Sequence, residues 1–327
     1  MTRTKYLLGE AVRMALLLAA VSVAAFVLIT KAPIDPLVSY IGTNSTLSQE
    51  AKDEISEYWG LDDPLPQRFV TWAGHALQGD LGESITYKKP VLSIIRERFS
   101  YSFGLMLTAW TLSGILGFLV GTACGIFQGS PFDRAVKVFC LGVKSAPTFW
   151  LGLLILTVFA VQLGWFPIGM AAPVGKLASE VTLGDRLYHL ALPAFTLTIV
   201  SMSEVVLYTR QKLSEIMSSD FILYARARGE SRGQIIVRHA LRNIALPAVT
   251  VQFASFSELF GGMALAENVF SYPGIGTATT AAAMNGDVPL LLGLALCSAV
   301  FVFAGNLIAN LLYGVFDPRI REGSGHA

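Results

Sequence analysis

Few side chains in this sequence have the types and spacing that catalysis requires. The four histidines are scattered, and none has the spacing of a metal ligand set. The three cysteines lie in apolar runs without a CxxC pair, which predicts inert thiols rather than a disulfide framework or a zinc site. The nearest fragment of a GxxxxGK[ST] phosphate loop is Gly175-Lys176, but Leu177 follows and the first glycine is missing. We therefore expect no catalytic residue, metal site or bound cofactor in this chain.

The most concentrated chemistry is a run of positive charge. Residues 210–247 hold seven lysines and arginines but only three acids. Such a segment suits anionic lipid headgroups or a groove in another protein. The formal net charge of the whole chain is only +1, so nucleic-acid binding driven by global charge is excluded.

The rest of the chain, which must position this basic segment, is largely apolar. Residues of the AVILMFWYC set make up 53% of the chain, charged residues make up 14%, and the mean hydropathy is +0.57. These values exclude an ordinary water-soluble globule and a disordered chain. Because a helix needs about 20 apolar residues to cross a bilayer, we expect an all-α, polytopic membrane protein with about six transmembrane helices. The six segments are 11–30, 102–127, 145–163, 190–209, 248–270 and 289–316.

The distribution of basic residues predicts the orientation. We interpret the first segment as an uncleaved anchor rather than a signal peptide. Six spans then place both termini on one side of the membrane. The two ends of the chain, with residues 128–144 and 210–247, hold 15 basic residues, and the other side holds nine. Cytoplasmic loops carry the excess of lysine and arginine, so both termini are predicted to be cytoplasmic.

Two acidic residues within the predicted spans are candidates for a substrate path. Charged side chains inside a membrane are costly, so they are functional candidates by default. Glu204 lies in the fourth segment, and Glu258 lies near the middle of the fifth, beside small residues that permit close helix approach. Glu258 either attracts a cationic substrate or is a hydrogen-bonded packing residue. Glu267, near the outer end, is expected to be structural.

The long segment 31–101 is predicted to lie outside the membrane. A capping box that begins at Thr46 predicts a short helix over 46–58. Three aromatic residues are available to pack this segment onto the membrane face, namely Trp59, Phe69 and Trp72.

The basic segment 210–247 predicts a helix–Gly–helix hook. Helix-forming residues extend to Arg228, and Gly229 is well placed just past a helix end because glycine tolerates φ > 0. Ser231 is the N-cap candidate of a second short helix. We expect the hook to bury its apolar residues, which are Ile222, Leu223, Ala225, Ala227, Ile235, Ile236 and Leu241.

At this hook the chain resembles the inner-membrane permeases of bacterial ATP-binding-cassette (ABC) importers. The general coupling signature of that family is Glu-Ala-Ala, three residues, Gly, nine residues, then Ile-x-Leu-Pro. Here Gly229 takes the glycine position and Leu241 the leucine position, while His239 and Arg242 stand where Ile and Pro would be. Leu223 and Tyr224 likewise replace Glu-Ala.

Those departures resemble one branch, the dipeptide/oligopeptide/nickel permeases, which read Tyr-x-Arg-x-x-Gly and then His-x-x-Arg-Asn. The resemblance extends over almost the whole chain, through pieces such as Gly79-Asp-Leu-Gly-Glu-Ser84, Gly129-Ser-Pro-Phe-Asp-Arg134 and Asp317-Pro-Arg-Ile-Arg321. It implies a type I ABC importer permease fold. A glutamate at position 258 is more similar to nickel-type than to peptide-type members, which weakly favours a metal or metal-chelate cargo over peptides.

The resemblance also implies partners. They are a second homologous permease, two cytoplasmic ATPase subunits that bind ATP and Mg, an external substrate-binding protein and the lipid bilayer. His239 is interpreted as a hydrogen-bonding strut, and Arg238, Arg242 and Asn243 are expected to help it fix the returning helix to the first. The ATPase-coupling candidates are Leu223, Tyr224, Ala225, Arg226, Ala227, Arg228, Gly229, Glu230, Arg238, His239, Arg242 and Asn243.

The expected organisation has four parts. Residues 1–30 form the tail and first span, 31–101 the external segment, 102–316 the permease core with the coupling loop at about 210–247, and 317–327 the cytoplasmic tail. Two other function classes make different demands on the sequence. A membrane enzyme needs paired catalytic groups on its spans, and no such set is present in the sequence. A receptor or scaffold with a docking loop remains open, and copurification of ATPase subunits would distinguish it from a permease.

Overall fold

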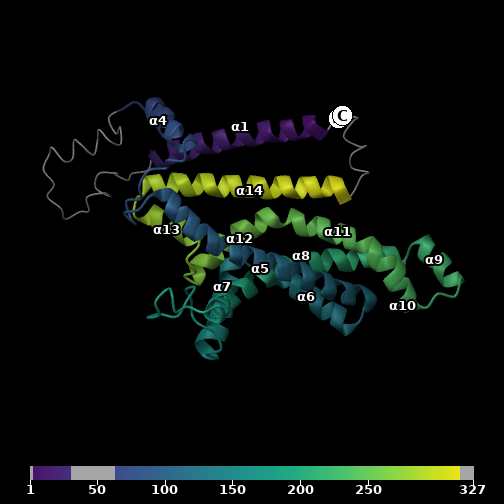
Figure 1. Cartoon of the computed structure of the whole chain (residues 1–327). Coiled ribbons are helices and arrows are strands. Elements are labelled where there is room, and N and C mark those ends of the chain that lie inside the picture. The colour runs from purple at the N-terminus through teal and green to yellow at the C-terminus, as the bar shows by residue number, and fades with distance from the viewer. Residues whose placement is uncertain (1–2, 31–62, 317–327) are drawn as a thin grey trace. The chain divides into compact units, whose positions relative to one another are not determined.

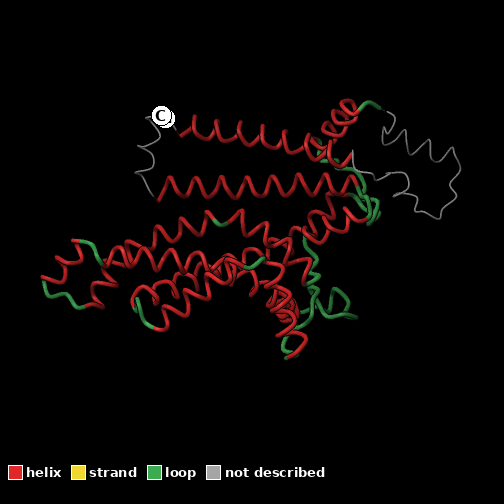
Figure 2. Tube along the Cα trace, turned by 180° about the vertical axis from the view of Figure 1, so that it is seen from behind, coloured by secondary structure: helices red, strands yellow, loops and turns green. Residues whose placement is uncertain are grey.

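The computed structural model describes residues 3–30 and 63–316, and in this part of the chain all regular elements are helices (Figure 2). The helix predicted over 46–58, Trp59 and the C-terminal tail lie outside the described residues. The described chain divides into two compact units. One comprises Met1–Ser102 with Pro273–Ala304, and the other Phe103–Tyr272 with Gly305–Ala327.

All six predicted spans correspond to apolar helical segments. Within the described residues, three helices are long and apolar enough to cross a membrane: α5 (Val91–Ile126), α8 (Leu183–Met217) and α14 (Val288–Phe316). Two bent helix pairs account for the third and fifth spans, and Val12–Leu28 within α1 (Arg3–Thr30) is a shorter apolar helix. The short helix α13 (Ile275–Met284) was not anticipated.

The third span starts at a sharp bend, and the fifth span is bent near its middle. Residues 145–163 were expected to form one helix, and the helical part is α7 (Thr148–Ile155) with the π-helix η1 (Leu156–Gln162) that continues it. Ser145 instead ends the preceding helix α6 (Pro131–Ser145), and the chain bends by 112° between the two. Pro147 explains the break, because proline disfavours a helical residue before it, and Ala146 is extended. The fifth span bends by 49° at Ser255, between α11 (Leu241–Ala254) and α12 (Phe256–Val269).

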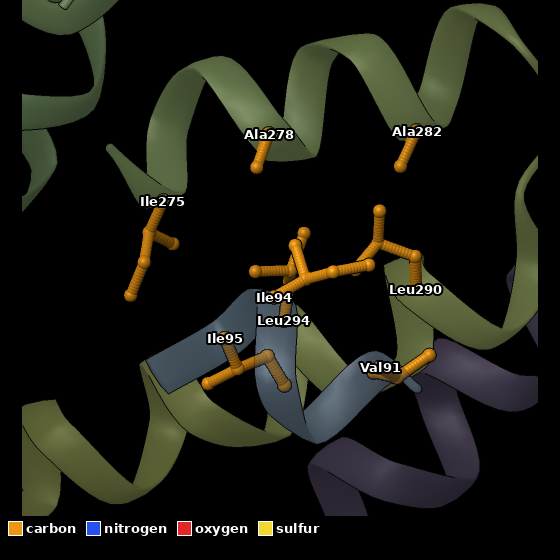
Figure 3. Close-up of a cluster of buried hydrophobic side chains, with 8 residues drawn as sticks. All are labelled: Val91, Ile94, Ile95, Ile275, Ala278, Ala282, Leu290 and Leu294. Carbon is orange, nitrogen blue, oxygen red and sulfur yellow. The ribbon is translucent and has the colours of Figure 1, made fainter. Parts of the chain in front are cut away.

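The first unit has an apolar core beside a buried aspartate. Residues from α5, α13 and α14 point toward one another in Figure 3, and Gly293 of α14 leaves room for Val91. Asp287, which precedes α14, is fully buried and accepts hydrogen bonds from Ser84 Oγ (2.5 Å), Thr86 N (2.9 Å) and Leu290 N (3.2 Å). One carboxylate thus caps a helix and ties the 84–86 turn to it.

The first unit also holds an aromatic contact between the external segment and α1. Helix α4 (Leu65–Leu77) places Phe69 and Trp72 against Phe26 of α1, with ring centroids 5.4 Å and 5.9 Å apart. Two of the three aromatic residues predicted to pack this segment therefore contact the first apolar helix.

In the second unit, α5 and α8 approach closely along a row of glycines on α5, which we call the glycine ridge. The ridge consists of Gly117, Gly121 and Gly125. A Cβ added at these positions would lie 2.8 Å from Cβ of Val205, 2.7 Å from the carbonyl oxygen of Val206 and 2.7 Å from Cδ2 of Leu213, respectively. Small residues at this spacing let membrane helices pack backbone to backbone. Glycine is therefore required here for space.

Candidate functional site

The predicted hook is a distinct structure at one end of the second unit. Helix α8 ends at Met217, and α9 (Asp220–Ala227), α10 (Arg232–Ile235) and the π-helix η2 (Ile236–Ala240) lead into α11. We call residues 218–240 the hook. Figure 1 shows α9 and α10 beyond the ends of α8 and α11.

The turn of the hook is built as the sequence predicts. Gly229 has φ +83°, its N–H bonds the Arg226 carbonyl at 2.9 Å, and the Glu230 N–H reaches the Ala225 carbonyl at 3.2 Å. This pair of bonds is a Schellman motif, which satisfies carbonyls at a helix end. Ser231 and Gln234 form a capping box at the start of α10, so the predicted N-cap is confirmed.

The hook has a small core of its own and an exposed apolar surface. Ile222, Ala225 and Ile235 are buried together. Leu223 and Ala227 were expected to be buried but are exposed, because they lie on the side of α9 away from Ile222 and Ala225. The exposed large apolar residues of the hook are Phe221, Leu223, Tyr224 and Val237, and the last three are each about two-thirds exposed. The Arg228 guanidinium lies 6.0 Å from the centroid of the Tyr224 ring.

The returning helix is held through His239. Its Nε2 lies 2.9 Å from Glu230 Oε2, and Asn243 Nδ2 donates to its carbonyl at 2.7 Å. The expectation that Arg238 and Arg242 share this role is wrong. Both are exposed, and neither forms an ion pair with a described residue, because the buried side of this stretch is formed by apolar residues such as Ala240 and Ile244.

Two side-chain contacts tie the hook and the end of α8 to the end of α5. Arg232 Nη2 donates to the Ile126 carbonyl, and Ser214 Oγ donates to Gln128 Oε1 at 2.9 Å. Between them lies a pocket of about 350 Å³, lined in part by Arg226 and Arg232. The hook is therefore anchored on one side and exposed on the other.

Sequence reasoning missed a buried ion pair next to this anchor. Asp133, in the first turn of α6, is 1% exposed and receives a two-pronged contact from Nε and Nη2 of Arg210 on α8, the latter at 2.7 Å. Asp133 Oδ2 also accepts from Gly129 N at 2.8 Å, and Ser130 is the N-cap of α6. The Ser-x-x-Asp spacing was a visible capping signal, but the arginine partner is 77 residues away in the chain.

The two acidic path candidates have different surroundings. Glu204 Oε2 lies 3.6 Å from Lys144 Nζ, and both side chains are about 40% exposed. A packing role for Glu258 requires a buried side chain, but Glu258 is exposed in the first turn of α12, just after the bend at Ser255. The described residues therefore do not support its interpretation as a packing residue. Glu258 shares one exposed face of α12 with Gly261, Leu265 and Asn268.

Comparison with known proteins identifies the class of this chain. Residues 115–322 match the family described as "Binding-protein-dependent transport system inner membrane component". The chain is 33% identical over 305 residues to the oligopeptide transport system permease protein AppB of Bacillus subtilis (strain 168), covering 93% of this chain and 95% of that protein. The chain belongs to this family.

Further comparisons agree with this assignment. The permease is 32% identical over 317 residues to the di/tripeptide transport system permease protein DppB of Pseudomonas aeruginosa (strain UCBPP-PA14), covering 92% of this chain and 94% of that protein. Its fold resembles a chain of the MetNI methionine ABC transporter in an inward-facing conformation. The TM-score is 0.56 at 14% identity, over 69% of this chain and 97% of that one.

Membership of this family confirms the predicted protein class and fold. The chain is the transmembrane permease subunit of an ABC importer, an all-α, multi-pass protein of the inner membrane with the type I permease fold. Such a subunit works with ATPase and binding-protein partners.

Proposed function

We propose that this permease forms the path by which peptides enter the cell, with both of its termini in the cytoplasm. Relatives named for oligopeptide and di/tripeptide transport match it along more than nine-tenths of its length. These names favour peptides over the nickel or metal-chelate cargo suggested by Glu258. The orientation is supported by the 15 basic residues on the hook side of the spans against nine on the other.

In this proposal the hook is the docking element for an ATPase subunit. The observation that carries it is the division of the hook into a buried core and exposed apolar residues. Ile222 and Ile235 are inside, whereas Leu223, Tyr224 and Val237 are exposed although they are large and apolar. An apolar surface edged by arginine is typical of a protein interface. The core and the Gly229 turn make the hook rigid enough to carry a movement.

The complete importer contains a second homologous permease, two ATPase subunits and an external binding protein that delivers the peptide. ATP and Mg bind to the ATPase subunits, so this permease is not an enzyme by itself. Closure of the ATPase pair moves the hooks and shifts the spans between inward-facing and outward-facing states. ATP can drive that shift only by binding the two states with different affinity.

Glu258 is the proposed contact with cargo along the path. Its carboxylate is exposed on α12 beside a bend, and Gly261 on the same face leaves space next to it. A peptide carries an ammonium group at its N-terminus, which a carboxylate in a poorly solvated path attracts strongly. Glu204 is a second candidate, although Lys144 balances its charge.

The decisive experiment is peptide uptake by proteoliposomes that contain the complete importer. We expect Gly229→Val to reduce uptake strongly, because valine resists the positive φ at the turn of the hook. Gly233→Val is the matched control, since both glycines have open space around a Cβ and only Gly229 has a positive φ. Normal uptake in the Gly229 variant would remove the hook as the coupling element. Uptake of a nickel chelate but no peptide would overturn the cargo assignment.

A further inference from the structure

The connection between α5 and α6 is fixed to α8 from several directions. We call residues 126–133 the corner. It turns at Gly129, which has φ +81°, and Ser130 then caps α6. Within this turn the Asp133 carboxylate bonds the Gly129 N–H on its own segment and the Arg210 guanidinium on α8.

The Asp133–Arg210 pair makes this attachment specific. A guanidinium presents its donors in a rigid planar fork, so a two-pronged contact with a carboxylate sets orientation as well as distance. Asp133 is 1% exposed, and the Arg210 side chain is 19% exposed. Neither group is accessible enough to serve as a surface for cargo or for an ATPase. The function of this pair has to be sought in how it positions other residues.

Arg210 lies near the end of α8, the helix that leads into the hook. One turn after it, Leu213 packs against Gly125 of α5, and Ser214 bonds Gln128 of the corner. Helix α8 then enters the hook, and Arg232 bonds back to the Ile126 carbonyl. The corner is therefore bonded to α8 on the membrane side of the hook and to the hook itself.

We propose that Asp133 and Arg210 are positioning residues that make the hook, the corner and the end of α8 move as one rigid body. A push on the hook then reaches α5, α6 and α8 together. Without the pair, the hook would be held to the corner by the exposed contacts of Ser214 and Arg232 and by the apolar packing of Ile126 against Leu213 and Ala240. Neither kind of contact fixes orientation as a two-pronged ion pair does, so part of the displacement of the hook would be lost before it reached the spans. This inference rests on the proposed function, because it requires that an ATPase moves the hook.

A removable cross-link tests the rigid body without disturbing the ion pair. Gln128→Cys and Ser214→Cys, in a variant whose three native cysteines are alanine, would be joined by a short thiosulfonate cross-linker. If the corner and α8 move together, the cross-linked importer should take up peptide at the rate of the two single-cysteine controls. Loss of uptake on cross-linking, with recovery after reductant, would overturn the proposal. An importer with the native sequence that takes up no peptide would instead refute the proposed function.

A substitution tests the pair itself. Asp133→Asn keeps the volume and removes the charge, and we expect peptide uptake per ATP hydrolysed to fall by about fivefold or more, as coupling free energies of allosteric systems imply. ATPase subunits should still copurify, because the exposed residues of the hook are unchanged. Glu215→Gln is the control, since its 2.7 Å contact with Lys212 is an exposed ion pair. Unchanged uptake per ATP in the Asn variant would contradict the role of the pair. If that variant does not reach the membrane, the cross-link result decides.

Discussion

Two buried aspartates, one in each unit, join distant parts of the chain by different means. Asp133 joins α6 to α8 and is balanced by the positive charge of Arg210. Asp287 joins the 84–86 turn to α14, and the partners of its carboxylate are the neutral donors Ser84, Thr86 and Leu290. Substitution of either Asp133 or Arg210 breaks the ion pair, and a second substitution at the other residue removes the unpaired charge that is left. Substitution of Asp287 removes a helix cap, and no second substitution among its neutral donors replaces the lost acceptor.

The largest expected effect is that of Arg210→Leu, which leaves the Asp133 carboxylate buried without its partner. Removing one member of a buried pair typically costs about 3–5 kcal/mol of unfolding free energy. The double variant Asp133→Asn/Arg210→Leu should recover most of this loss, because no unpaired charge remains. Thermal unfolding of the purified permease in detergent would measure both. A double variant as unstable as the single one would contradict the ion-pair interpretation.

Asp287→Ala should have a smaller but local effect. It leaves Ser84 Oγ and two backbone N–H groups without their acceptor, at about 1–3 kcal/mol for a buried unsatisfied group. We expect faster hydrogen exchange in residues 79–90 and an unchanged hook. Ser84→Ala should not restore the stability of the Asp287 variant. Restoration would show that the two buried aspartates are equivalent.

A third prediction concerns the turn of the hook. Gly229→Ala should lower the unfolding free energy by about 1 kcal/mol, because a Cβ disfavours the left-handed conformation by roughly 1–2 kcal/mol. Gly233→Ala should be neutral or slightly stabilising, since its position is helical and alanine is the better helix former. Equal effects of the two substitutions would mean that the positive φ is not what requires Gly229.

The smallest expected effect on stability is that of Glu258→Gln. An exposed side chain away from packing contacts usually changes stability by less than about 0.5 kcal/mol. Peptide uptake should nevertheless fall if the carboxylate attracts the peptide ammonium group. Uptake and abundance in the membrane are measured together, and peptide binding to the external protein should be unaffected. Full uptake in this variant would reject Glu258 as a cargo contact.

What could be predicted from the sequence is mostly local. Apolar length defined the helices, and glycine and serine chemistry placed the hook turn at Gly229 and Ser231. The partner of Asp133 could not be predicted, because the contact depends on how α6 and α8 pack. The exposure of Glu258 was missed for a related reason. A count of apolar residues locates a span, but it does not show which face of a bent helix is left uncovered.

The glycine ridge of α5 has a consequence at the level of the gene. Every missense change in a glycine codon introduces a residue with a Cβ, and at Gly117, Gly121 and Gly125 that atom would lie within 3 Å of α8. Even alanine, the mildest replacement, would force α5 and α8 apart and disturb the contact of Leu213 next to the corner. These three codons should therefore tolerate only synonymous mutations, although none of the glycines has a side chain that could touch peptide or ATPase.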